Sequence, residues 1–267
     1  MPGAVGSVRR HAAPLACLIL ALAGSAAAQE PLPHPPSRPA FLSRYDFFVL
    51  LAGLDSNDNR FSWDAQVAAD LDVVDYVGGR ASVRAGYQAY LGNEQQLFDP
   101  NQALYTLEAS SSFRAGPTEF AAVLHHLSRH LSDRANKRGI AMNVAGGRVL
   151  RRIPVAGATL DLRADAGWVI MRRYLDYTWR AQVDLVARRP LTARFGLLGR
   201  AFGETYGVNP TIAGRDAQHG GRLEGGVRIS GQAAALELFA GYERVVDADP
   251  LGRQPGRWAF GGFRVVN

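Results

Sequence analysis

Cysteine is nearly absent from this chain of 267 residues, in which Cys17 is the only one. A disulfide bond needs two cysteines, so no disulfide within the chain can stabilise the fold. Long apolar runs are absent as well. The run from Leu15 to Leu22 falls well short of the roughly 20 residues that a membrane-spanning helix requires. These absences exclude a disulfide scaffold and a helical membrane protein.

No segment carries charge of a single sign. The formal net charge is +6, and removal of Arg9 and Arg10 with the signal described below leaves +4. Basic residues alternate with acidic ones along the chain, so no basic stripe forms on one face. We therefore expect no nucleic-acid partner.

Residues 1–28 have the three parts of a secretory signal. Arg9 and Arg10 form the basic region, Leu15 to Leu22 the short apolar region, and Ala26 to Ala28 a cleavage site of small residues. We predict cleavage after Ala28. Cys17 precedes most of the apolar run instead of closing it, which argues against a lipoprotein anchor.

Residues 29–43 are rich in proline, which removes backbone donors and favours extended, solvated chain. We predict a periplasmic stub here. Its prolines are Pro31, Pro33, Pro35, Pro36 and Pro39.

From residue 44 to residue 267 the sequence alternates between apolar and polar residues. In the segment 61–73 every odd position is apolar, and most even positions are charged or polar. A period of two is typical of strands that have two different faces. Similar segments are 81–91, 105–114, 160–170, 177–185, 222–229 and 236–243.

The polar face of these segments carries charges over strands of about 10 residues, as in transmembrane barrels with a polar interior. The charged residues include Asp161, Arg163, Asp165, Arg180, Asp184, Arg222, Glu224 and Arg228. We predict an all-β fold, an antiparallel transmembrane β-barrel of about twelve strands spanning residues 44–267 in the cell outer membrane. We expect its lumen to be narrow and filled with ion pairs, and its assembly to need the barrel-assembly machinery.

Short and long connections largely alternate along the chain, as expected for short periplasmic turns and longer extracellular loops. The predicted turns lie near residues 78–79, 116–117, 154–157, 190 and 231. The predicted long loops are 93–101, 131–137, 206–219 and 247–256.

The segment 125–133 is the one local cluster of catalytic residue types. His126 and Ser128 are two positions apart, so on a strand they share a face about 6.6 Å apart. The parity of Phe120 and Leu124 places that face toward lipid, near the extracellular end. A histidine beside a hydroxyl is the pairing that makes serine a nucleophile.

The H-x-S string at residues 126–128 resembles the arrangement in outer-membrane phospholipase A and the lipid A 3-O-deacylases. The longer string at 126–133 is similar to a segment in an uncharacterised family of bacterial outer-membrane proteins. The resemblance covers about ten residues and the barrel architecture. It implies that Ser128 is the nucleophile and His126 the base, oriented by a third polar residue on the next strand.

Two residues are candidates for that third position. Asn143 stands where the phospholipase would have an asparagine, but the apolar residues Ile140, Met142 and Val144 predict that it faces inward unless the strand has a bulge. Asp133, in the adjoining loop, is the alternative. The deacylase glutamate has no counterpart between residues 139 and 150, and Arg129 replaces the asparagine that often follows the serine in both enzymes.

No metal site is expected, because His125 and His126 point to opposite faces and His126 lies about 13 Å from His130 along a strand. The acidic segment 55–59 has the composition of a turn built from Asp and Asn. No cofactor is expected, except calcium if the site works as in the phospholipase. The tryptophans Trp63, Trp168, Trp179 and Trp258 have the parity of barrel-surface or interface residues.

Two hypotheses from different classes follow. The first is a structural or narrow-transport outer-membrane protein with an ion-paired lumen. The second is an outer-leaflet serine esterase, of the lipid A deacylase or phospholipase A type, that uses His126 and Ser128. Outer-membrane lipids and lipopolysaccharide are then its partners; the sequence leaves the oligomeric state open.

Overall fold

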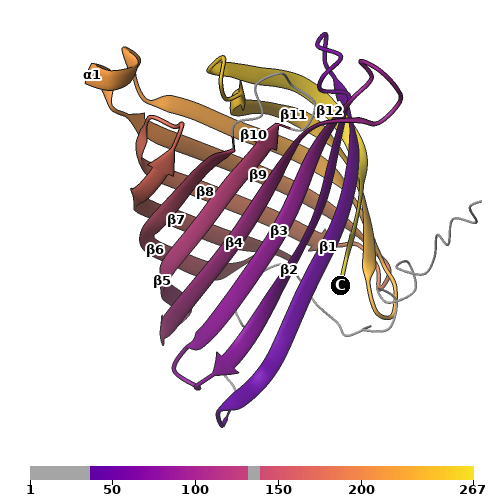
Figure 1. Ribbon diagram of the computed structural model, residues 1–267. Coiled ribbons are helices and arrows are strands. Elements are labelled where there is room, and N and C mark those ends of the chain that lie inside the picture. Colours follow the sequence, from indigo (N-terminus) through magenta and orange to yellow (C-terminus); the bar gives the residue numbers. More distant parts are fainter. Residues whose placement is uncertain (1–36, 132–138) are drawn as a thin grey trace, which may run out of the picture.

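The computed structural model describes residues 37–131 and 139–267, which form one closed antiparallel barrel of twelve strands (Figure 1). Each strand pairs with the next along the chain, and β1 closes the ring against β12. The elements are β1 Ala40–Asp55, β2 Trp63–Asp75, β3 Arg80–Gly92, β4 Asp99–Ala115, β5 Thr118–Leu131, β6 Ile140–Val155, β7 Ala158–Arg173, β8 Tyr177–Pro190, β9 Phe195–Val208, α1 Pro210–Ala213, β10 Gln218–Ser230, β11 Ala235–Asp249 and β12 Gln254–Val266.

The predicted fold class is confirmed, but the first strand begins earlier than predicted. Strand β1 begins at Ala40, four residues before the predicted boundary, and a register shift separates Phe41 from Arg44. The predicted signal, residues 1–28, lies outside the described residues. Within the described part of the chain no helix has the length and apolarity needed to cross a membrane.

Alternation along the strands separates a polar inside from an apolar outside. In β2, Asp64, Asp70 and Asp72 are at most 9% exposed, whereas Val67 is 45% exposed. The pleat sends successive side chains to opposite faces, so the predicted parity of this strand is confirmed.

The outer surface of the barrel carries a belt of exposed apolar side chains that passes around the ring. Its members include Val49, Val67, Val83, Tyr105, Leu107, Leu124, Trp168, Val183, Leu197, Leu223, Leu238 and Phe263. Large apolar areas left open to solvent mark contact with a partner or with lipid. A closed antiparallel barrel with an apolar outside and a charged inside is the architecture of outer-membrane proteins, and it places this chain in the outer membrane.

Ion pairs fill much of the interior, as the charged face predicts. Arg148 donates two hydrogen bonds of 2.7 Å to Glu108 and contacts Asp165. Arg80 likewise joins Asp72 and Glu119 at 3.0 and 2.8 Å. Buried guanidinium and carboxylate groups satisfy each other here, which a buried charge requires.

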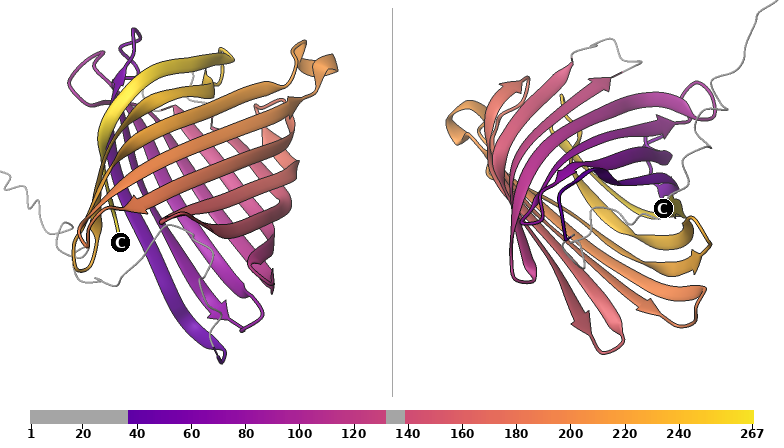
Figure 2. Two further views of the ribbon diagram at one scale, coloured as in Figure 1. Left: turned by 180° about the vertical axis from the view of Figure 1, so that it is seen from behind. Right: turned by 90° about the horizontal axis from the view of Figure 1, so that it is seen from below.

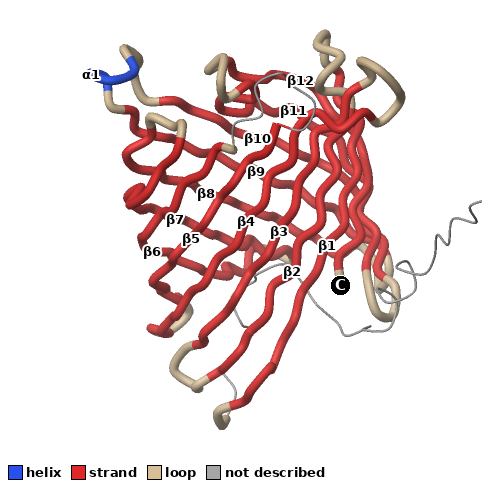
Figure 3. The backbone as a smooth tube through the Cα atoms, in the orientation of Figure 1, coloured by secondary structure: helices blue, strands red, loops and turns tan. Residues whose placement is uncertain are grey.

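The two ends of the barrel differ in their connections (Figure 3). At one end, here called the turn end, the links are two to four residues long, as at 116–117 and 156–157. At the opposite, loop end the links are mostly longer, and the rule for such barrels makes this the extracellular end. The predicted loops 93–101, 206–219 and 247–256 are shorter than expected, because β4, β9, β10, β11 and β12 continue into them.

Residues 245–249 of β11 fold across the loop end of the lumen; we call them the cross-lumen segment. The pairing of β11 with β12 shifts register between Val245 and Asp249. Gln102 of β4 donates to the Ala248 carbonyl at 2.8 Å, and Arg129 of β5 donates to the Asp247 carbonyl at 2.7 Å. Neither β4 nor β5 neighbours β11 in the ring, so these bonds cross the opening.

Apolar clusters fill the loop end beneath the cross-lumen segment. One contains Phe61, Tyr90 and Trp258; the other contains Met142, Tyr177, Tyr206 and Val246. Trp258 is 3% exposed and its Nε1 donates to Glu243, so its predicted surface position is wrong. Trp168 and Trp179 are exposed on the outside, at 73% and 39%.

Candidate functional site

Strand β5 presents His126 and Ser128 on the outside of the barrel near the loop end. Their neighbours in the sequence, His125, Leu127 and Arg129, line the lumen. Because side chains alternate across the strand, His126 and Ser128 share the outward face, where Leu124 is 53% exposed. The predicted lipid-facing parity of this pair therefore agrees with the geometry.

Asn143 also faces outward, and the inward orientation predicted for it is wrong. Ile140 and Met142 are each 1% exposed and line the lumen. The apolar clusters at the loop end draw the apolar residues of β6 inside, which reverses the parity that hydrophobicity alone suggests. The outward residue between Met142 and Val144 is then Asn143.

No bulge in β6 is needed for this orientation. The register shift in this region lies in the pairing of β6 with β7, where Asn143 faces Met171 and Val144 faces Val169. The extra residue is Ile170 of β7. Both Ile170 and Met171 are more than half exposed, so the shift enlarges the apolar surface beside Asn143.

Asn143 and His126 are register partners on adjacent strands, joined by a hydrogen bond of 2.6 Å between His126 Nδ1 and Asn143 Oδ1. An amide oxygen only accepts hydrogen bonds, so Nδ1 must carry the proton. The Asn143 amide nitrogen lies 3.8 Å from Met171 Sδ, an acceptor, which supports this orientation of the amide. In the neutral ring the lone pair then belongs to Nε2, the nitrogen that a general base uses.

Ser128 lies one outward position further along β5. Its register partners are Tyr105 on β4 and Ala141 on β6, and Ala141 in turn pairs with Arg173 on β7. Arg173 is exposed, and its guanidinium lies 5.3 Å from the Tyr174 ring. With strands about 4.8 Å apart, the backbones at Ser128 and Arg173 are separated by about 10 Å.

The surface around the pair is apolar. Leu107 is the other register partner of His126 and is 54% exposed, and Trp168 is 73% exposed two strands away. Tyr105 makes edge-to-face contact with His130, with ring centroids 5.4 Å apart. The polar pair thus lies within a surface suited to acyl chains.

His125 and Arg129, two other residues of the segment 125–133, point into the lumen and do not join this site. His125 Nδ1 lies 3.3 Å from Glu108 inside the barrel, and Arg129 reaches the cross-lumen segment. Asp133, the alternative orienting residue, lies outside the described residues.

Among the residues that the structure describes, no three His, Cys, Asp or Glu side chains gather in a way that could hold a metal. In the segment 55–59, Asp58 pairs with Arg60 at 2.6 Å, and Arg60 also binds Asp249 at 2.9 Å. The Asp58 carboxylate is thus already neutralised by an arginine.

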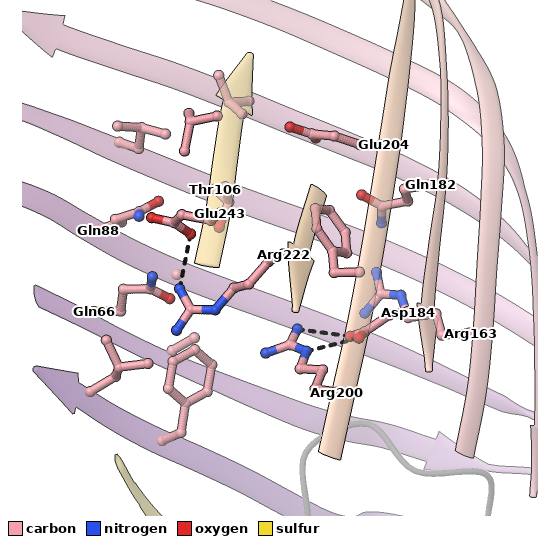
Figure 4. Close-up of a pocket in the computed structure, with 18 of the residues that line it drawn as sticks. Gln66, Gln88, Thr106, Arg163, Gln182, Asp184, Arg200, Glu204, Arg222 and Glu243 are labelled. Atoms are coloured by element: carbon pink, nitrogen blue, oxygen red, sulfur yellow. Dashed lines mark hydrogen bonds and ion pairs between the residues drawn. The ribbon is translucent and has the colours of Figure 1, made fainter. Parts of the chain in front are cut away.

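The lumen contains a cavity of about 450 Å³, which sequence analysis did not locate. Figure 4 shows Arg222, Arg200 and Arg163 reaching into it from three different strands. Arg200 holds Asp184 through two hydrogen bonds of 2.8 Å, and Arg222 lies 3.1 Å from Glu243. The alternation of apolar and polar residues in the sequence identifies which charged residues face inward. It does not identify which of them line a cavity.

Ion pairs fix the cross-lumen segment above this cavity. Arg215, in the loop after α1, donates to Asp247 at 2.9 and 2.7 Å and to Asp176 at 3.0 and 2.8 Å. Tyr177 also donates to Asp247. Burial raises the pKa of Asp176, but the hydrogen bonds and charge of Arg215 outweigh it and hold that pKa below its ordinary value.

Comparison with known proteins identifies no family for this chain. The chain matches no family model and no curated protein. Among solved structures it is similar to a bacterial polysaccharide outer membrane secretin, with 10% identity over 85% of this chain and 99% of that one and a TM-score of 0.39. It is also similar to the translocator domain of the autotransporter NalP from Neisseria meningitidis, with 14% identity over 83% and 86% of the two chains and a TM-score of 0.36.

Proposed function

We propose that this chain is an outer-leaflet serine esterase that cleaves acyl esters of membrane lipids, with Ser128 as nucleophile, His126 as base and Asn143 as orienting residue. The observation that carries the proposal is the 2.6 Å bond between His126 Nδ1 and Asn143 Oδ1 on the lipid-facing surface, with Ser128 two residues along. A nucleophile, a base and a group that orients the base are the parts such a site needs.

The reaction follows from the proton on Nδ1. His126 Nε2 takes the proton of Ser128 as Oγ bonds to the acyl carbon of the ester. The imidazolium then gives that proton to the leaving alcohol oxygen as the ester C–O bond breaks, leaving an acyl-enzyme. Water, deprotonated by His126, releases the fatty acid and restores the serine. Asn143 keeps the ring in the tautomer with a free Nε2 throughout.

The location of the site favours lipid as substrate. Leu107, Leu124 and Trp168 provide an apolar surface for acyl chains, and Arg173 is placed to bind a phosphate group. Phospholipids and lipid A combine acyl esters with phosphate. Lipopolysaccharide and phospholipid are therefore the proposed substrates.

The test is fatty-acid release from lipopolysaccharide and from phospholipid by the refolded barrel, with and without calcium. We expect release by the parent and its loss in Ser128→Ala and in His126→Ala. Ser111→Ala and His219→Ala change exposed residues away from the triad and should retain activity. A folded parent that releases no more than Ser128→Ala, under either calcium condition, excludes the esterase.

A second candidate function is narrow transport through the lumen, or a purely structural role of the barrel. The cavity of about 450 Å³ supports the first and the dense ion pairs support the second. Conductance in planar bilayers separates them, because a transport barrel passes ions and a filled structural barrel does not.

A further inference from the structure

The lumenal cavity is lined by more hydrogen-bond donors than acceptors. Its described lining includes ten arginines and six carboxylates, and no lysine. Each guanidinium has five N–H donors and accepts nothing, whereas a carboxylate only accepts. Arginines outnumber carboxylates in the lining of this space.

Several arginines form short ion pairs with carboxylates of the wall. Arg200 holds Asp184 with two bonds, and Arg228 and Arg264 share Glu237 at 2.6 Å each. These groups make a rigid wall. A ligand would have to displace strong ion pairs to bind them.

Arg84 and Arg180 differ from these arginines in their distance to the nearest carboxylate. The nearest carboxylate to Arg84 is Asp70, at 3.8 Å, and the nearest to Arg180 is Glu204, also at 3.8 Å. Both distances are too long for a hydrogen bond. Arg180 donates instead to the neutral amide of Gln182, and its buried Nε has no hydrogen-bond partner among the described residues.

The barrel places these two arginines on opposite sides of one cavity. Arg84 comes from β3 and Arg180 from β8, five strands apart in a ring of twelve, and both line the same space. Gln66 and Gln88 lie on the β2 and β3 side of it (Figure 4). Guanidinium groups on two sides of one cavity, with amides beside one of them, suit an anionic group that also bears hydroxyls.

We propose that the lumenal cavity is a binding site for a small phosphorylated organic anion, held between Arg84 and Arg180. A phosphate offers several acceptor oxygens to the donors that the wall leaves unused. The volume lies within the range of small-ligand sites. The site does not depend on the esterase, which lies on the opposite face of the sheet.

Isothermal titration calorimetry of the refolded barrel in a zwitterionic detergent and a phosphate-free buffer tests the proposal. The probes are glucose 6-phosphate, inorganic phosphate and glucose. We expect the parent to bind glucose 6-phosphate, to bind inorganic phosphate more weakly and not to bind glucose. Binding of the two phosphates with equal affinity assigns the site to free phosphate.

Arg84→Gln and Arg180→Gln should each weaken binding of glucose 6-phosphate at least tenfold, with the barrel intact by circular dichroism. Arg257→Gln removes an exposed arginine from the outside and should bind as the parent does. If either lumenal variant fails to fold, the other and the salt dependence of binding carry the test. The proposal is overturned if the folded parent binds neither phosphate, or if neither folded lumenal variant differs from Arg257→Gln.

Discussion

Asn143 determines, at the scale of single residues, which nitrogen of His126 carries the proton. Its Oδ1 accepts from Nδ1 at 2.6 Å. Without Asn143 the His126 ring can rotate and can carry its proton on Nε2. That nitrogen then has no lone pair with which to act as a base.

We predict that Asn143→Ala lowers kcat on lipid esters about tenfold to hundredfold, less than the loss of about 10² to 10⁴ expected for removing the base in His126→Ala. KM should change little, because Asn143 acts through His126. The measurement is kcat and KM on phospholipid in mixed micelles, and Thr205→Ala, on the far strand β9, is the control. An Asn143→Ala enzyme with unchanged kcat would remove Asn143 from the triad.

Arg173 lies in the same cross-strand row as Ser128, so we expect it to act on substrate selection. Arg173→Gln should raise KM for a phosphate-bearing phospholipid and leave hydrolysis of neutral diacylglycerol unaltered, because only the former offers a partner for the guanidinium. Parallel assays of the two lipids check this, with Arg257→Gln as control. An equal loss on both lipids contradicts a role in headgroup binding.

The sequence could identify His126 and Ser128, because a spacing of two on an alternating strand is a local property. It could not place Asn143 or Trp258. Their orientation depends on apolar clusters made by residues far apart in the chain, such as Phe61 with Trp258 and Met142 with Tyr177. Near the loop end, an apolar residue in the sequence therefore indicates burial in the lumen rather than contact with lipid.

The cross-lumen segment is the element that closes the loop end. It is held by Arg215, which binds Asp247 of the segment and Asp176 of the β7–β8 loop. Its closure thus depends on these ion pairs together with the hydrogen bonds that Gln102, Arg129 and Tyr177 donate to the segment.

We predict that Arg215→Gln increases single-channel conductance in planar bilayers at every pH, because it releases the cross-lumen segment. In the parent, the bond to Asp176 is fully present above the ordinary aspartate pKa of about 3.9 and is lost as pH falls through the lowered pKa of the folded state. Conductance of the parent should therefore stay level from pH 7 to about pH 4 and rise below it. A parent protein whose conductance falls as the pH is lowered would contradict the role of the Arg215 ion pairs in closing the lumen.

Hydrophobic alternation was sufficient to predict most strands, because the polar inside and apolar outside repeat with period two. The ends of the strands could not be predicted as well from the sequence. The predicted loops contain Asn101 and Asp247, polar residues typical of connections, yet both lie in strands, where Asn101 donates to the Arg60 carbonyl and Asp247 binds Arg215.

At the scale of the whole molecule, buried ion pairs connect strands that are not neighbours. Arg148 of β6 binds Glu108 of β4 and so joins strands on either side of β5. The side chain of Arg148 is 1% exposed. Its removal leaves a buried carboxylate short of its main partner.

We predict that Arg148→Ala lowers the free energy of unfolding by roughly 3–5 kcal/mol, the usual cost of breaking a buried pair. Arg151→Ala, on the same strand but exposed, should cost far less. Urea unfolding in lipid vesicles, followed by tryptophan fluorescence, compares the two. Equal losses would show that the network adds nothing to stability.

The closed ring has a consequence for how the chain can be connected. Strand β1 begins and strand β12 ends at the turn end, and the two strands are paired side by side from Phe48 with Val266 to Asp55 with Ala259. The fold therefore has no intrinsic first strand. A linker that runs the length of residues 40–47, about 26 Å at the rise of a strand, with a cut at the turn 116–117, gives a circular permutant in which β5 comes first and every strand keeps both of its neighbours.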